Sequence, residues 1–131
     1  MQIKRKYDKI TNISEKERSD NPMPTNVQIT INHFIQEVKG LLGERLKKVI
    51  LYGSYARGDF RKNSDIDIML LTDLDDKEIE EYRDKVSEIA FNIELEKEIY
   101  ISPIIKNIDK YNARINVVPF YMNVHKEGVE L

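Results

Sequence analysis

The sequence contains no cysteine, and only two of its 131 residues are histidine. Without cysteine the chain can form neither disulfide bonds nor thiolate metal sites, which fits a reducing compartment such as the cytoplasm. His33 and His125 are far apart in the sequence and have no partner at metal-ligand spacing. These absences exclude a disulfide-stabilised fold and disfavour a metal site built on histidine.

Long apolar runs are also absent. No run approaches the roughly 18 residues that a helix needs to cross a bilayer. The N-terminal segment MQIKRKYDKI lacks the apolar core of a signal peptide. We therefore expect a cytoplasmic protein that makes no membrane contact.

Charge of one sign does not dominate: the formal net charge is −2, although charged residues make up 34% of the chain. Because no global positive field would attract nucleic acid, we do not expect a nucleic-acid partner. A length of 131 residues fits one domain. Residues 1–24 hold a basic start and the proline-containing stretch SDNPMP, so we interpret them as an N-terminal extension or linker. The domain itself is expected over residues 25–131.

Hydrophobic periodicity predicts six elements in this domain. Apolar residues recur at intervals of three and four in two segments, and β-branched or alternating runs mark the strands. Thr25 with Gln28, and Asp75 with Glu78, have the spacing of capping boxes at helix starts. The predicted elements are a helix over 25–42, strands over 47–53 and 64–72, a helix over 75–93, a strand over 98–105 and a short helix from 116 onward.

This order of elements predicts an α/β (α+β) domain, a small mixed sheet with helices packed on one face. Gly43 is expected to end the first helix. Pro103 indicates that the last strand lies at an edge of the sheet or ends there, because proline cannot donate to a ladder. The apolar run Val117–Met122 is expected to belong to the last helix and to close the core, with a partner surface as the alternative.

A glycine–serine pair and two aspartates carry the chemical signal. Gly53 and Ser54 are followed by ten residues and then by Asp65-Ile66-Asp67. Alternate residues of a strand share a face, so the two aspartates point one way while Ile66 packs into the core. Magnesium prefers such carboxylates together with substrate phosphates, and a cation would relieve the repulsion between them.

The other wall of this predicted site is suited to phosphate. Gly53 ends a strand without a side chain that would obstruct a phosphate, and Ser54 begins a possible short helix, SYAR. Arg57, Arg61 and Lys62 lie in the connecting loop and could meet the outer phosphates. Paired aspartates alone are common on exposed sheet faces, but the joint pattern favours a functional site.

The stretch GSYARGDFRKNSDIDI, residues 53–68, resembles the nucleotidyltransferase superfamily typified by DNA polymerase β, in its minimal single-domain form. The resemblance covers about residues 25–131. It implies transfer of a nucleoside monophosphate, such as AMP from ATP, to an acceptor with release of pyrophosphate. It also implies that Asp65 and Asp67 hold two magnesium ions, that Gly53 and Ser54 contact the triphosphate, and that Ser64 supports the same loop.

Members of this superfamily usually carry a third carboxylate on a later strand. In EIYISPII, residues 98–105, Glu98 is the only acid on the face that it should share with Tyr100 and Ser102. Glu98 is therefore the candidate third catalytic and metal-binding acid. The alternative is a solvated strand end, in which case the domain would bind nucleotide but catalyse poorly.

The resemblance also implies a partner. Minimal members are often paired with a small helical HEPN-type protein as a toxin–antitoxin system, in which the nucleotidyltransferase can modify the toxin with AMP. We expect a protein acceptor with a hydroxyl, such as tyrosine, as the attacking group. The alternatives are an antitoxin that acts by masking its partner, and a nucleotide sensor with weak or no catalysis.

Overall fold

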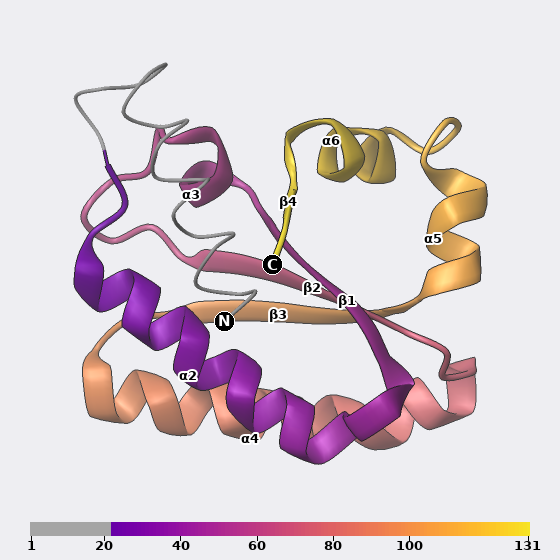
Figure 1. The fold of residues 1–131 in the computed structure, drawn as a ribbon, viewed down its shortest axis with the longest axis horizontal. Helices are drawn as coiled ribbons and strands as arrows, with labels where there is room; N and C mark the ends of the chain where they lie inside the picture. Colours follow the sequence, from indigo (N-terminus) through magenta and orange to yellow (C-terminus); the bar gives the residue numbers. More distant parts are fainter. Residues whose placement is uncertain (1–21) are drawn as a thin grey trace.

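The computed structural model of the protein describes residues 22–131. Five α-helices, one 3₁₀ turn and four strands make up this part of the chain (Figure 1). In chain order they are α2 (Thr25–Leu42), the 3₁₀ turn Gly43–Arg45, β1 (Leu46–Tyr52), α3 (Ser54–Arg57), β2 (Ile66–Thr72), α4 (Asp76–Lys97), β3 (Ile101–Asn107), α5 (Ile108–Arg114), α6 (Pro119–Glu127) and β4 (Val129–Glu130).

The four strands form one mixed sheet in the order β3-β2-β1-β4, which confirms the predicted fold class. β1 pairs antiparallel with β2 and with β4, whereas β2 and β3 run parallel across the connection through α4. β3 lies at an edge, as Pro103 predicted. The register places Tyr52 opposite Asp67, so the end of β1 and the start of β2 meet at one end of the sheet.

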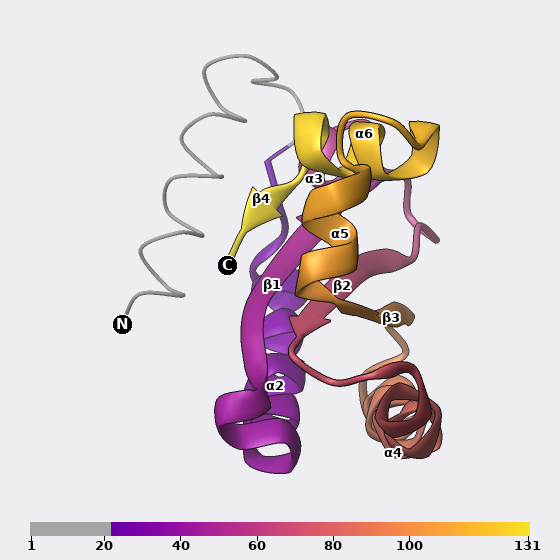
Figure 2. The ribbon, with the colours of Figure 1, turned by 90° about the vertical axis from the view of Figure 1, so that its right-hand side faces the viewer.

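The sheet is covered on both faces, and here the prediction of helices on one face is wrong. α2 and α4 pack on the face that carries Ile66, Ile68 and Leu70. α5 and α6 lie on the opposite side of the sheet, where Met69 and Leu71 are fully buried (Figures 1 and 2). β2 is a central strand whose second half is apolar on both faces, a pattern that alternation alone does not reveal. Asp67 precedes Met69 on this second face.

Helix ends follow the sequence signals in two of three places. The capping box of Asp75 and Glu78 is present at the start of α4. Gly43 ends α2 with a positive φ of 55°. The predicted box at Thr25 is wrong, because Pro24 is the N-cap residue and the Gln28 side chain donates instead to the Met23 carbonyl, at 3.0 Å. Proline at this position fixes an extended entry into the helix, which displaces Thr25 into the first turn.

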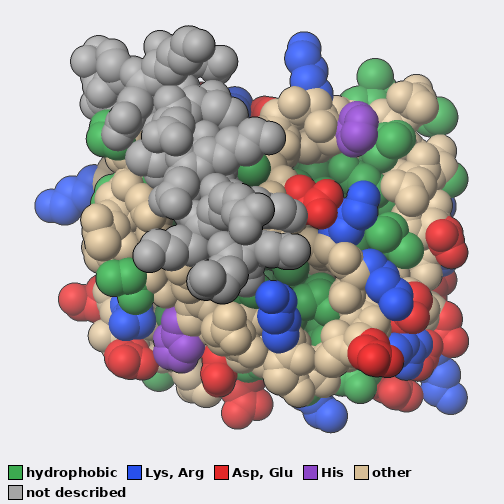
Figure 3. Space-filling model, in the orientation of Figure 1, with side chains coloured by type: hydrophobic (Ala, Val, Ile, Leu, Met, Phe, Trp, Pro, Cys, Tyr) green, Lys and Arg blue, Asp and Glu red, His purple; other side chains and the backbone are tan. Residues whose placement is uncertain are grey.

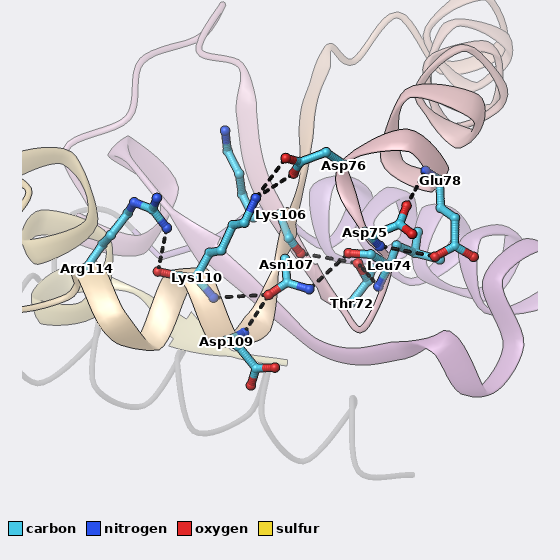
Figure 4. A network of polar contacts seen from close by, with 10 residues as sticks. All are labelled: Thr72, Leu74, Asp75, Asp76, Glu78, Lys106, Asn107, Asp109, Lys110 and Arg114. Carbon is cyan, nitrogen blue, oxygen red and sulfur yellow. Dashed lines mark hydrogen bonds and ion pairs between the residues drawn. The ribbon is translucent and has the colours of Figure 1, made fainter.

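α5 was not predicted, although its start has an N-cap signal. Asn107 Oδ1 accepts from the backbone N–H groups of Asp109 and Lys110, and its amide donates to the Leu74 carbonyl at 2.9 Å (Figure 4). Lys110 also pairs with Asp76 at the start of α4. One asparagine therefore joins the end of β3, the start of α5 and the loop before α4.

The C-terminal segment is more elaborate than the single helix that was expected. After α6 the chain turns at Gly128 and adds β4 beside β1. A Cβ at Gly128 would lie 2.6 Å from Ile50 Cγ2, so this turn is packed tightly against the sheet. The prediction that Val117–Met122 closes the core is largely wrong: Val117, Phe120 and Met122 are exposed, and Val124 is the buried residue of α6.

The described surface carries charges of both signs (Figure 3). Acidic and basic side chains are interspersed on the described part of the face in Figure 3, in keeping with the balanced composition. None of the helices in residues 22–131 is long and apolar enough to cross a membrane. The predicted extension, residues 1–24, lies largely outside the described residues; within them, Met23 packs on the core beside α2.

Candidate active site

The centre of the site is the contact between Gly53 and Asp67. Gly53 follows β1 with φ 76° and ψ −156°, a conformation that is essentially restricted to glycine. A Cβ at this position would lie 3.0 Å from Asp67 Cγ and would overlap its Oδ2 atom. The sequence predicted that Gly53 leaves room for a phosphate; in the structure it also leaves room for the Asp67 carboxylate. This contact brings the acid pair against the glycine–serine turn.

The turn continues into α3, the short SYAR helix that the sequence predicted. Gly53 is its N-cap, and Gly58 ends it in the left-handed region at φ 88°. Because α3 has only four residues, its dipole is weak, and phosphate binding would depend chiefly on the side chains of Ser54 and Arg57. Both side chains face the same cavity.

This cavity has a volume of about 550 Å³, within the usual range for small-molecule sites. The acids that line it are Asp65, Asp67 and Glu127, and the cation that lines it is Arg57. The full lining is Tyr52, Gly53, Ser54, Arg57, Asn63, Ser64, Asp65, Asp67, Phe120, Asn123, Val124 and Glu127. The structure thus brings together Gly53, Ser54, Arg57, Ser64, Asp65 and Asp67, six of the residues predicted from the sequence.

Arg57 is held between two carboxylates. Its Nε–H donates to Asp59 and its Nη1–H donates to Glu127, each at 3.1 Å. These hydrogen bonds raise the pKa of Arg57, with the Asp59 bond as the largest cause. They use two of the five donors of a guanidinium, so donors remain for phosphate oxygens. Arg57 is therefore fixed beside the serine turn as a cation.

The two aspartates differ in exposure. Asp65 lies just before β2 and is exposed, whereas Asp67 is the second residue of the strand and is half-buried. Burial raises the pKa of Asp67, and the charges of Asp65 and Glu127 raise it further against the opposing effect of Arg57. An ionised Asp67 is thus destabilised by its surroundings, and a bound cation would relieve this cost.

Two tyrosines beside these acids have raised pKa values. Burial and the charge of Asp67 raise the pKa of Tyr52 to about 12. Burial and the charge of Asp65 raise the pKa of Tyr55. Both phenols therefore stay protonated at neutral pH. Tyr55 stacks on Phe60 with ring centroids 4.5 Å apart, so this aromatic packs within the protein.

Arg61 and Lys62 lie elsewhere than predicted. They line a second cavity of about 310 Å³ together with Tyr55, Phe60 and Tyr100. Within this loop the Arg61 N–H donates to Ser64 Oγ at 2.7 Å, and the Ser64 N–H donates to the Arg61 carbonyl at 3.0 Å. Ser64 thus supports the turn that precedes Asp65, and Asn63 and Ser64 line both cavities.

Glu98 is not on a strand, and its predicted position is wrong. α4 continues through the helix-forming sequence ELEK to Lys97, and Glu98 is its C-cap residue with φ 57°. Pairing with β2 begins only at Tyr100, whose carbonyl accepts from Ile66, and β3 starts at Ile101. Glu98 lines the second cavity rather than the one that holds the aspartates. Its role as third acid stays a prediction.

The residue beside Asp67 on β3 is Ser102, not an acid. No group of three or more His, Cys, Asp or Glu side chains suited to a metal occurs within residues 22–131. Magnesium is often held by one or two carboxylates together with substrate phosphates, so Asp65 and Asp67 remain a fitting donor set.

Sequence reasoning missed the wall that α6 contributes. Phe120, Asn123, Val124 and Glu127 line the cavity from this helix, about sixty residues after the motif. Their spacing of three, one and three is that of a single helical face, which is a visible signal. Nothing in the sequence connects that face to the motif, because the connection runs through the pairing of β4 with β1.

Residues 31–123 match the family described as nucleotidyltransferase domain. The chain belongs to this family. The Gly-Ser and Asp-x-Asp resemblance is thereby confirmed, and the nucleotidyltransferase family is one of enzymes that take a nucleotide substrate.

This nucleotidyltransferase is similar to two named proteins of one organism and, more remotely, to a solved structure. The Methanocaldococcus jannaschii protein named "Putative protein adenylyltransferase MJ0604" is 35% identical over 103 residues, which cover 79% of this chain and 95% of that protein. A second protein of that organism, "Putative protein adenylyltransferase MJ0141", is 39% identical over 103 residues, covering 77% and 94%. A solved toxin–antitoxin structure with AMP-PNP is similar with a TM-score of 0.45 at 20% identity, over 74% of this chain and 68% of that chain.

The geometry at Gly53 predicts an unusually costly substitution. Gly53→Ala should lower the free energy of unfolding by about 1–3 kcal/mol from the backbone conformation alone, and it should also push the Asp67 carboxylate away. Gly40→Ala, in α2, is the matched control, because a Cβ there meets nothing within 4 Å. It should stabilise by about 0.5–1 kcal/mol. Urea unfolding of both variants measures this, and equal stabilities would contradict the close contact.

The raised pKa of Asp67 predicts a pH-dependent gain from its removal. The folded state binds the Asp67 proton more tightly than the unfolded state, so ionisation costs stability at neutral pH. Asp67→Asn should therefore raise the free energy of unfolding at pH 7, by less than about 1 kcal/mol because the group is partly solvated. The gain should vanish as the pH falls toward about 4. Urea titrations across this range, with exposed Asp84→Asn as control, would contradict the assignment if Asp67→Asn destabilised at pH 7.

Proposed function

We propose that this nucleotidyltransferase is a magnesium-dependent protein adenylyltransferase, which transfers AMP from ATP to a hydroxyl group of a partner protein. The observation that carries the proposal is the contact of Asp67 with Gly53, which joins the acid pair to the glycine–serine turn in one cavity. The names of the two similar proteins support a protein acceptor.

Magnesium fits the residues present. Asp65 and Asp67 offer hard oxygen ligands, and the repulsion that raises the pKa of Asp67 is what a divalent cation would remove. When bound with the nucleotide, the metal would neutralise phosphate charge and polarise the reacting phosphoryl group. Asp65 and Asp67 would hold it.

The remaining residues bind and orient the triphosphate. Ser54 lies at the cavity wall and can donate its hydroxyl hydrogen to a phosphate oxygen, while the fixed Arg57 offers guanidinium donors. In the transfer, an acceptor hydroxyl oxygen forms a bond to the α-phosphorus as the bond to the β-phosphate oxygen breaks. Pyrophosphate leaves with that electron pair, and the hydroxyl proton passes to a carboxylate of the cavity.

The acceptor would be a partner protein with an accessible hydroxyl, and a HEPN-type helical protein remains the expected partner from the sequence resemblance. The exposure of Asp65, which lies just before β2, supports an acceptor that reaches the acid pair from solvent. The cytoplasmic location expected from the sequence likewise stays a prediction.

Transfer of label from ATP tests this function. With Mg²⁺ and a cognate partner, the wild-type protein should label the partner, and chelation of the metal should abolish labelling, because three carboxylates line the cavity against one guanidinium. Asp65→Asn and Asp67→Asn should each lower the rate at least about a hundredfold. Asp84→Asn, exposed on α4, should keep the wild-type rate. If the variant that combines Asp65→Asn and Asp67→Asn still neutralises the partner fully in cells without labelling it, a masking antitoxin would be favoured instead.

The same assay decides which acid is the third one. Glu127→Gln should reduce transfer more than Glu98→Gln, because Glu127 lines the cavity of the aspartates and contacts Arg57. Glu98 lines the neighbouring cavity. A larger loss in Glu98→Gln would restore the prediction made from the sequence and would require the end of α4 to move toward Asp65.

A further inference from the structure

One face of α6 runs along the candidate active site from a charged end to an aromatic end. Glu127, Val124, Asn123 and Phe120 line the cavity, and successive members lie one helical turn or less apart. Glu127 contacts Arg57, so the C-terminal end of α6 adjoins the serine turn. Phe120 lies seven residues earlier, about 10 Å farther along the helix axis. A nucleotide whose phosphates meet Arg57 would extend its ribose and base along this face.

Phe120 is an exposed aromatic whose orientation is fixed. Its side chain remains 43% exposed although it lines the cavity. Its ring makes edge-to-face contacts with Tyr52, at a centroid distance of 5.9 Å, and with Tyr121, at 5.4 Å. Beside these contacts part of the Phe120 side chain stays exposed at the cavity, and aromatic rings bind nucleobases by stacking.

Asn123 lies one turn from Phe120 on the same face and is exposed. A carboxamide presents one donor and one acceptor side by side, which matches the N6 amino group and N7 of adenine. The position of the helix is secured by buried Val124, by the close packing of Gly128 on Ile50 and by the pairing of β4 with β1. α6 is thus anchored to the sheet at its C-terminal end.

We propose that α6 forms the nucleobase subsite, in which Phe120 stacks on the base and Asn123 selects adenine. This inference rests on the proposed function, since it requires that the cavity hold a nucleoside triphosphate. It extends that function by placing nucleotide selectivity in the C-terminal helix, outside the Gly-Ser and Asp-x-Asp motif. The second cavity, lined by the exposed Tyr100, is the competing location for the base.

The test compares ATP with inorganic tripolyphosphate, which has the phosphates without a base. In calorimetry with Mg²⁺, Phe120→Ala and Phe120→Leu should weaken ATP binding about 5- to 150-fold. Both should leave tripolyphosphate binding within about twofold of wild type. Phe120→Trp should retain ATP binding, and Asn123→Ala should reduce the preference for ATP over CTP. Phe91→Ala, on exposed α4 surface, is the control for loss of an aromatic.

Each outcome has a distinct meaning. Unchanged ATP binding in Phe120→Ala, equal loss of ATP and tripolyphosphate binding, or a selective loss of ATP binding in Tyr100→Ala would overturn the base subsite while leaving the proposed function intact. Failure of the wild-type protein to bind either ligand with Mg²⁺ would overturn both. Phe120→Leu keeps most of the apolar volume, so a selective loss of ATP binding in this variant reports the aromatic face and not a collapse of α6.

Discussion

The close approach of a carboxylate to a glycine Cα organises this molecule. Asp67 can face the glycine–serine turn only because Gly53 has no side chain and adopts a backbone conformation that other residues avoid. The register of β1 on β2, with Tyr52 opposite Asp67, delivers the two residues to the same end of the sheet. The acid pair and the glycine–serine turn, which belong to two different strands and their loops, thereby become parts of one cavity.

The two faces of the sheet have different tasks. The isoleucines of β2 and the stripes of α2 and α4 build the larger core, which fixes the strands. The opposite face changes character along β2, from acidic at Asp67 to fully buried at Met69 and Leu71. α5 and α6 cover the apolar part, and α6 extends beyond it over the acids. α6 therefore both covers a small core and lines the candidate site.

Local signals predicted much of this arrangement and missed what depends on distant pairing. The motif, the alternation of Asp65, Ile66 and Asp67, and the capping box at Asp75 are short-range features, and each appears in the structure. Glu98 was misplaced because strand character in the following residues does not reveal that α4 persists to Lys97. The contribution of Glu127 depends on β4 pairing with β1, a contact between segments almost eighty residues apart in sequence. No local sequence pattern indicates that two segments so far apart in the chain will pair.

The turn that carries Asn63 and Ser64 contributes to both cavities. Reciprocal hydrogen bonds between Arg61 and Ser64 fix the backbone of this turn, which therefore separates the two cavities. The cavity of the aspartates is lined by three carboxylates and one guanidinium, whereas the other is lined by aromatic rings, two basic side chains and Glu98. Two weakly binding fragments, one for each cavity, would gain affinity through their high effective concentration if a short linker joined them across this turn. The fold thus offers a route to bidentate inhibitors that a simple nucleotide analogue does not use.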